Sequence, residues 1–201
     1  MRNRSAIRIA QGALLTIGLL ALAYCAMEWA GAKLYQHRQA KRFAQQILSS
    51  AGGQTQTEKP AAVIKPPAGA VIGKLEIPRI GVSVMVVEGV DSGELSRAVG
   101  HIPGTALPGR AGNIGIAGHR DTFFRPLRSV HRNDAITLRT LTAAYRYQVT
   151  ATNVVRPEDV SVLGPTGQDT LTLVTCYPFY YLGAAPKRFV VRAERLPAAT
   201  P

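Results

Sequence analysis

An uncharged, largely apolar stretch from Ile9 to Met27 constrains this chain more than any other feature. Its nineteen residues would span about 28 Å as an α-helix. That length is close to the ~30 Å hydrocarbon thickness of a bilayer. Trp29 and Tyr35 follow the stretch, as aromatic residues at a membrane interface commonly do. The sequence therefore predicts a transmembrane anchor over residues 9–29.

A cleaved signal peptide is the alternative interpretation of this stretch. The apolar region of a signal peptide is usually about 7–15 residues long and ends at a cleavage site of small residues. The stretch here is longer, and Tyr24-Cys25-Ala26 fits such a cleavage site poorly. A retained single-pass anchor is therefore favoured.

Basic residues lie on both sides of the predicted anchor, so the positive-inside rule does not decide its orientation cleanly. The residues before the anchor are Arg2, Arg4 and Arg8, and those after it are Lys33, Arg38, Lys41 and Arg42. The first group lies closer to the apolar stretch, which favours a cytoplasmic amino terminus over residues 1–8. Everything beyond residue 30 would then lie outside the cytoplasm, held at the cell membrane.

The net charge of +12 is shared unevenly along the chain. Residues 1–70 contain nine Lys or Arg against two Asp or Glu, whereas residues 71–201 contain fifteen against ten. The basicity thus belongs mainly to the membrane-proximal part, where anionic lipid headgroups are the natural partner. The folded part lacks a dense basic stripe interleaved with aromatics, so nucleic acid is not expected as a partner.

The chain divides by composition into an anchor, a connecting region, a folded domain and a tail. Residues 30–70 are predicted to form a membrane-proximal helix, to about residue 50, and then a flexible stalk rich in Gly, Pro and Thr. Short β-branched runs separated by turn signals fill residues 71–196, and residues 197–201 form a tail. The predicted strands are 72–77, 82–88, 113–118, 135–139, 144–155, 169–175 and 188–194, with short helices at 91–98 and 124–130. So many short strands indicate a mainly β fold, either a small closed barrel or a sandwich.

Cys176 is the one cysteine in the predicted folded domain, because Cys25 lies within the anchor. Exported domains normally hold cysteines as disulfides, so a lone thiol there is more often reactive than structural. A buried small hydrophobe is the alternative reading. Cys176 ends one strand-like run and Arg188 begins the next, so antiparallel pairing would bring the two together. His119 ends a third run, and Cys, His and Arg at strand ends suggest a thiol acyl-transfer site.

The segments around these three residues resemble the sortases, membrane-anchored cysteine transpeptidases of bacterial surfaces. The matching segments are Ala117-Gly118-His119-Arg120-Asp121, Thr170-Leu171-Thr172-Leu173-Val174-Thr175-Cys176 and Lys187-Arg188-Phe189-Val190-Val191-Arg192, with a weaker match over 101–109. The resemblance covers roughly residues 71–195. It implies a closed eight-stranded β-barrel with short helices, preceded by an amino-terminal transmembrane helix.

Within the family, the GHRDTFF wording of residues 118–124 is most similar to class D. Residues 51–72 contain no Asp-Pro-Trp or Asp-Pro-Phe lid motif, which disfavours the pilus-polymerising branch. The sequence also has no obvious acidic cluster for the calcium site of some class A members. No metal and no cofactor are therefore expected.

The resemblance carries the family's catalytic histidine, cysteine and arginine onto His119, Cys176 and Arg188. The Cys176 thiolate would attack a backbone carbonyl and form a thioester. His119 would protonate the departing amine and later deprotonate the incoming one. Arg188 would stabilise the oxyanion with its planar set of donors. The implied partners are surface proteins with a C-terminal LPxTG-like sorting signal, cleaved after Thr, and an amine of the cell wall or of a protein lysine.

A further group of residues is predicted to bind the substrate. It comprises Thr175, His101, Pro103, Thr105, Ala106, Val160, Val162 and Leu163. The connection between strands 144–155 and 169–175 is apolar enough to receive a Leu-Pro dipeptide. Loop packing is the alternative for this connection and for His101, and an ordinary strand position is the alternative for Thr175.

Two other functions are compatible with the same sequence features. A surface cysteine endopeptidase would resolve the thioester with water instead of an amine. A noncatalytic β-domain would tether wall polymers and would not need the Cys176 thiol.

Overall fold

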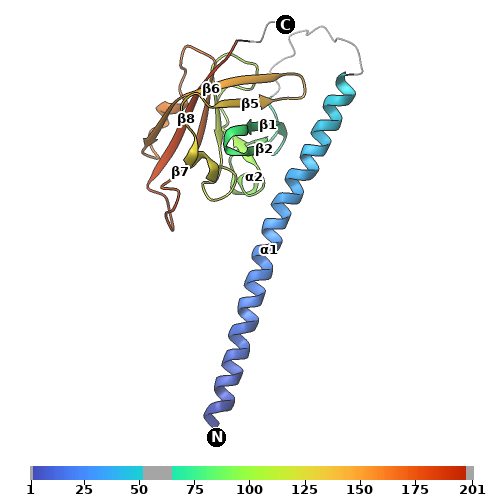
Figure 1. The fold of residues 1–201 in the computed structure, drawn as a ribbon, viewed down its shortest axis with the longest axis vertical. Helices are drawn as coiled ribbons and strands as arrows, with labels where there is room; N and C mark the ends of the chain where they lie inside the picture. The colour runs from blue at the N-terminus through green and yellow to red at the C-terminus, as the bar shows by residue number, and fades with distance from the viewer. Residues whose placement is uncertain (1, 52–64, 198–201) are drawn as a thin grey trace.

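The computed structural model describes residues 2–51 and 65–197, and it contains a small β-barrel beside one long helix (Figure 1). The eight strands are β1 (Val71–Ile77), β2 (Val82–Glu88), β3 (Val99–His101), β4 (Asn113–Ala117), β5 (Ala135–Arg139), β6 (Ala144–Val155), β7 (Thr170–Tyr177) and β8 (Lys187–Arg195). They close into a barrel in the order β1-β2-β3-β4-β7-β8-β6-β5. The predicted mainly β, eight-stranded barrel is confirmed.

Two of the barrel contacts are parallel, β2 with β3 and β4 with β7, and the others are antiparallel. The sequence did not predict β3, because a strand of three residues is too short to show a period. All three of its residues are nevertheless buried. The strand supplies the link between β2 and β4 that the closed barrel requires.

The core follows from the alternation of side chains along each strand. In β7, Leu171, Leu173 and Thr175 are buried, and the first two belong to the main apolar cluster. The same cluster takes alternate residues from the other strands and adds Phe124 and Leu127 from the connection after β4. Strand residues of the opposite parity therefore point out of the barrel, where the candidate site lies.

Short helical turns join the strands. They are η1 (Pro78–Ile80), α2 (Ser92–Leu95), η2 (Arg125–Ser129) and η3 (Val160–Leu163). The helix predicted at 91–98 is only four residues long, and the Asp91 side chain does not cap it. The turn predicted at 124–130 is confirmed as the 3-10 helix η2.

The helix α1 (Arg2–Ala51) is continuous for 50 residues and contains both the predicted anchor and the predicted membrane-proximal helix. Its amino-terminal part projects away from the barrel (Figure 1) and exposes large apolar side chains such as Leu14, Leu22 and Met27. This part is long and apolar enough to cross a membrane.

The carboxy-terminal part of α1 lies against β2 instead of standing free. Phe43 is buried in this contact. The Gln36 side chain accepts a hydrogen bond from the Met85 backbone N–H at 2.8 Å and donates one to the Arg97 carbonyl at 2.6 Å. The Arg97 guanidinium lies over the Tyr35 ring, 5.3 Å from its centre. The helix is therefore joined to the barrel by both packing and hydrogen bonds.

Both ends of the segment predicted as a flexible stalk, residues 51–70, belong to other elements. Ala51 belongs to α1, and residues 52–64 lie outside the described residues, as does the tail beyond 197. The Gly69 N–H donates to the Glu88 carbonyl at 2.8 Å, and the Glu88 N–H donates to the Ala70 carbonyl at 2.9 Å. Residues 69 and 70 thus extend the β1–β2 pairing and belong to the barrel.

Candidate active site

Cys176 and Arg188 are direct partners across the antiparallel pair β7 and β8. Cys176 follows Thr175, which is buried inside the barrel, so strand alternation directs the thiol to the outer face. Both Cys176 and Arg188 are half-buried. The predicted pairing of the two strand ends, with Cys176 opposite Arg188, is confirmed.

His119 reaches the same end of the barrel by a different route. Strand β4 runs parallel to β7 with Ala117 opposite Val174, and the Gly118 N–H donates to the Val174 carbonyl at 3.1 Å. His119 lies two residues past Ala117, and Cys176 lies two residues past Val174. The carboxyl ends of parallel neighbours meet at one edge. His119, which is exposed, therefore shares the rim that carries the thiol.

Gly118 makes the turn at His119 possible. A Cβ added to Gly118 would lie 2.7 Å from the Phe124 ring and 2.9 Å from Val99, too close for any other residue. Phe124 is fully buried, and its N–H donates to the His119 carbonyl at 3.0 Å. The Phe124 ring of the core therefore packs directly against Gly118. That ring holds the backbone of His119 in place.

The guanidinium of Arg188 bonds to its own loop. Nη1 donates to the carbonyls of Ala185 at 3.3 Å and Lys187 at 3.1 Å. Its Nε and Nη2 make no hydrogen bond within the described part of the chain, so donors are free to meet an oxyanion. Arg188 is thereby oriented while part of its donor set remains available.

Arg120, next to His119, organises the connection between β7 and β8. Its guanidinium donates to three carbonyls of that connection, those of Pro178 at 3.0 Å, Tyr181 at 2.8 Å and Gly183 at 2.9 Å. The sequence analysis assigned no role to this residue. The one available signal for such a role was its position next to His119 in the segment that resembles the sortases. The loop after Cys176 and the turn that carries His119 are therefore tied together.

Part of the predicted substrate-binding group lines the outer face of β4. A Cβ on Gly115 would lie 3.1 Å from side-chain carbons of Ile102, Thr105 and Leu163, so these three converge over one glycine. The Asn113 side chain fixes η3 by donating to the carbonyls of Val162 and Gly164, each at 3.1 Å. The structure brings Thr105 and Leu163 together on the face to which Cys176 also points.

Other members of that group lie elsewhere. Ala106 packs partly against the core, whereas Pro103 and Val160 are exposed. Val162 contributes its carbonyl to the Asn113 contact and also accepts a hydrogen bond from Arg192 at 3.4 Å. Their substrate-binding role stays a prediction.

His101 and Thr175 turn inward. His101 is buried, with Nδ1 2.7 Å from Glu88 Oε2 and Nε2 3.0 Å from both the Ala106 carbonyl and Thr105 Oγ1. This network fits the loop-packing alternative. Thr175 is also buried, and its hydroxyl donates to the Gly118 carbonyl at 2.7 Å. Neither side chain is presented to the outer face, because each satisfies its polar atoms inside the fold.

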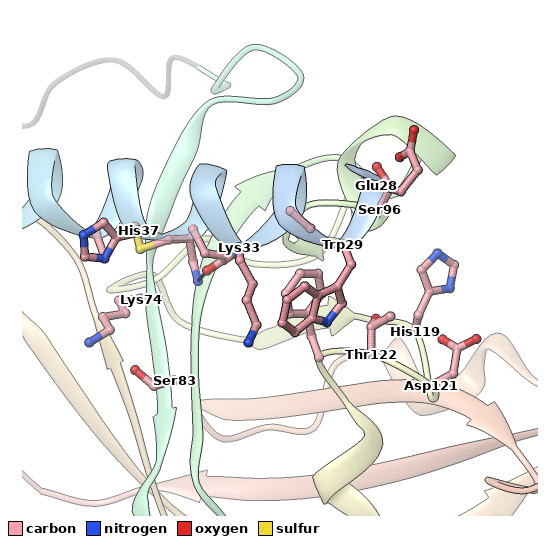
Figure 2. Close-up of a pocket in the computed structure, with 15 residues that line it drawn as sticks. Glu28, Trp29, Lys33, His37, Lys74, Ser83, Ser96, His119, Asp121 and Thr122 are labelled. Carbon is pink, nitrogen blue, oxygen red and sulfur yellow. Dashed lines mark hydrogen bonds between the residues drawn. The ribbon is translucent and has the colours of Figure 1, made fainter. Parts of the chain in front are cut away.

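A cleft of about 1070 Å³ lies between α1 and the barrel, and His119 and Asp121 line its rim (Figure 2). Trp29 and Lys33 of α1 form the opposite wall, with the Lys33 ammonium 3.8 Å from the Trp29 ring centre. The position of α1 beside the histidine was not predictable from the sequence. Residues 28–40 of α1 thus line the space beside His119, whereas Cys176 and Arg188 are not among the residues that line this cleft.

Within residues 2–51 and 65–197, no group of three or more His, Cys, Asp or Glu is arranged to hold a metal ion. The arrangement of thiol, imidazole and guanidinium on one barrel rim is that of a cysteine acyl-transfer enzyme.

Comparison with known proteins identifies the class. Residues 75–196 match the family model of the sortase domain, so the chain belongs to the sortase family of cysteine transpeptidases. It is 34% identical to Sortase D of Bacillus subtilis (strain 168) over 162 residues, which cover 79% of this chain and 82% of that protein.

Solved structures agree. A sortase D5 transpeptidase of Clostridium perfringens superposes with a TM-score of 0.64 at 26% identity, covering 82% of this chain and 98% of that one. Sortase A of Corynebacterium diphtheriae superposes with a TM-score of 0.60 at 28% identity, covering 79% and 82%. The predicted family and its likeness to class D are confirmed.

Proposed function

We propose that this sortase is anchored in the cell membrane by α1 and joins surface proteins to an amine through a thioester on Cys176. The observation that carries the proposal is the common rim on which Cys176 lies opposite Arg188 and beside the end of β4 that bears His119. The amino terminus would lie in the cytoplasm and the barrel outside it.

The first half-reaction breaks the peptide bond after Thr of an LPxTG-like sorting signal. The Cys176 sulfur attacks the Thr carbonyl carbon, and the developing oxyanion accepts hydrogen bonds from the free donors of Arg188. The tetrahedral intermediate collapses as His119 donates a proton to the departing Gly amine. The products are a thioester on Cys176 and a released carboxy-terminal fragment.

The second half-reaction transfers the acyl group. An acceptor amine, from a wall peptide or a protein lysine, attacks the thioester carbonyl while His119 takes its proton. A new amide forms and the Cys176 thiolate leaves, which restores the enzyme. Because His119 lines the cleft beside α1, the amine would approach from that side.

The outer face of β4 is the proposed binding site of the sorting signal. Thr105 and Leu163 meet over Gly115, where the absent side chain lets their apolar atoms pack close to the strand. The Leu-Pro portion would contact these apolar atoms, and the Thr-Gly bond would reach Cys176 at the rim.

The test uses the full chain in lipid nanodiscs with a randomised library of signal peptides. Mass spectrometry should show an acyl adduct on Cys176 and, with an added amine such as triglycine, an amide product. Cys176→Ala should give neither. Free acid as the sole product despite abundant amine would favour the endopeptidase, and full biological effect of Cys176→Ala would favour the noncatalytic wall-binding domain.

A further inference from the structure

The connection between β7 and β8 presents a run of large apolar side chains to solvent. Tyr180 is 75% exposed, Tyr181 48% and Leu182 96%. Elsewhere in the described part of the barrel, exposed large apolar residues occur singly, as at Leu141, Val154 and Val160. A contiguous exposed run of this kind marks an interaction surface.

Tyr180, Tyr181 and Leu182, called the apolar tip below, stand on a rigid base. Beneath the tip, the rings of Tyr177, Phe179 and Phe189 contact one another at centroid distances of 5.3–6.3 Å. Arg120 adds three hydrogen bonds to carbonyls of the connection. The apolar side chains are therefore held outward by the structure beneath them.

Basic side chains surround the tip. The Arg120 guanidinium lies 5.8 Å from the Tyr181 ring centre, and that of Arg128 lies 5.5 Å from the Tyr180 ring centre. Arg125 and Lys187 nearby in sequence are exposed as well. Residues 177–193 contain no Asp or Glu, and Asp121 is the one acid in residues 119–133. Tyrosine and leucine ringed by arginine and lysine is the composition of a surface that meets anionic lipid.

The tip lies at the end of the barrel nearer the amino terminus of α1. Figure 1 shows the connection between β7 and β8 hanging from the barrel on the side of the amino terminus of α1, with the turn between β5 and β6 at the opposite end. Independently, His119 and Asp121 line one cleft with Glu28 and Trp29, at the end of the predicted anchor. The catalytic rim and its neighbouring tip therefore face the side on which a membrane holding α1 would lie.

We propose that Tyr180, Tyr181 and Leu182 insert into the interface of an anionic bilayer. This inference rests on the proposed function in one respect, the anchoring of α1 in a membrane. The barrel is then attached to the bilayer at two points, by α1 and by the tip, which gives it one orientation. In that orientation Cys176 lies close to the lipid surface.

The experiment uses tryptophan fluorescence of the full chain in nanodiscs that contain anionic lipid with brominated acyl chains. The natural chain has a single tryptophan, Trp29, so its quenching reports the anchor. A Trp29→Phe/Leu182→Trp chain reports the tip, and a Trp29→Phe/Leu141→Trp chain is the matched control at the opposite end of the barrel. We expect Leu182→Trp to lose a fraction of its fluorescence comparable to that lost by Trp29, and Leu141→Trp to lose little.

The outcomes separate the two claims. Quenching of Trp29 without quenching of Leu182→Trp overturns the inference and leaves the anchor in place. Absence of Trp29 quenching overturns the anchor itself. Quenching of Leu182→Trp that appears only after a signal peptide is added would assign the tip to peptide binding and overturn its membrane role. Weaker quenching in nanodiscs of zwitterionic lipid alone supports the part assigned to the arginines.

Discussion

Thr175 and Cys176 are adjacent in β7, yet their side chains leave the strand on opposite faces. The period of two places the thiol on the outer rim and the threonine inside the barrel. There the Thr175 hydroxyl donates to the Gly118 carbonyl, immediately before His119. At the residue scale, the position before Cys176 thus links the strand that carries the thiol to the turn that carries the imidazole of His119.

This contact makes Thr175→Val informative. The variant keeps the shape of the side chain but leaves a buried carbonyl without its partner, which costs about 1–3 kcal/mol. We expect a lower free energy of unfolding in urea titrations, whereas Thr152→Val at an exposed position of β6 should have little effect. Unchanged stability with a raised KM for the signal peptide would instead support the predicted substrate contact of Thr175.

Arg188 offers a test of the oxyanion role. Arg188→Lys keeps the charge but loses the planar array of donors, and loss of such a donor typically lowers kcat by about 10²–10³-fold. We expect kcat for peptide transfer to fall accordingly, with a small change in KM. Arg195→Lys on the same strand, where the arginine pairs with Asp169 at 2.8 Å, serves as the matched control. Full kcat in Arg188→Lys would rule out donation from the guanidinium fork.

At the scale of elements, the Gln36 side chain adds hydrogen bonds to the packing that holds α1 on the barrel. Gln36 satisfies the Met85 N–H, which lies just before the residues of β2 that pair with β3. Gln36→Leu should remove about 1 kcal/mol from this contact and speed hydrogen exchange of the Met85 amide about fivefold. Mass spectrometry of the β2 peptide in the full chain measures this rate.

Gln45→Leu, on an exposed face of α1, is the control for this experiment. Its exchange at Met85 should match that of the natural chain. Equal exchange in the Gln36→Leu chain would mean that packing around Phe43 alone holds the helix on the barrel.

Some contacts between elements were predictable from the sequence, and others were not. The pairing of β7 with β8 was predictable because neighbouring runs with strand-end signals commonly form an antiparallel pair. The parallel contact of β4 with β7 was not, since it joins strands separated by β5 and β6 and depends on barrel closure. The seating of α1 was not predictable either, because a glutamine on a helix carries no sign of a distant backbone partner. The hydrogen bonds of Arg120 were not predictable for the same reason, because they join segments that are far apart in the sequence. The position of the apolar tip also depends on them.

At the scale of the whole molecule, the ion pair between Arg79 and Asp134 lies on other elements than the strand ends that carry Cys176 and Arg188. Asp134, just before β5, is buried and bonds to Arg79 of η1 and to the His131 N–H at 2.8 Å. Arg79 also reaches the Ser129 carbonyl of η2. One ion pair therefore joins the β1–β2 and β4–β5 connections of the barrel without touching Cys176, so its loss should change stability and spare the chemistry.

The pH dependence of stability tests this pair. The Arg79 guanidinium, through its hydrogen bonds, lowers the pKa of Asp134 below its usual 3.8 in the folded state. A lowered folded pKa means that the stabilisation is complete above the unfolded value and is lost as pH falls through the folded one. Asp134→Asn should therefore lower the Tm by a few degrees at pH 7, and the difference from the natural chain should shrink in acid. Asp91→Asn, at an exposed carboxylate, should show no such pH-dependent difference, and a difference for Asp134→Asn that persisted undiminished in strong acid would assign the contact to packing instead of charge.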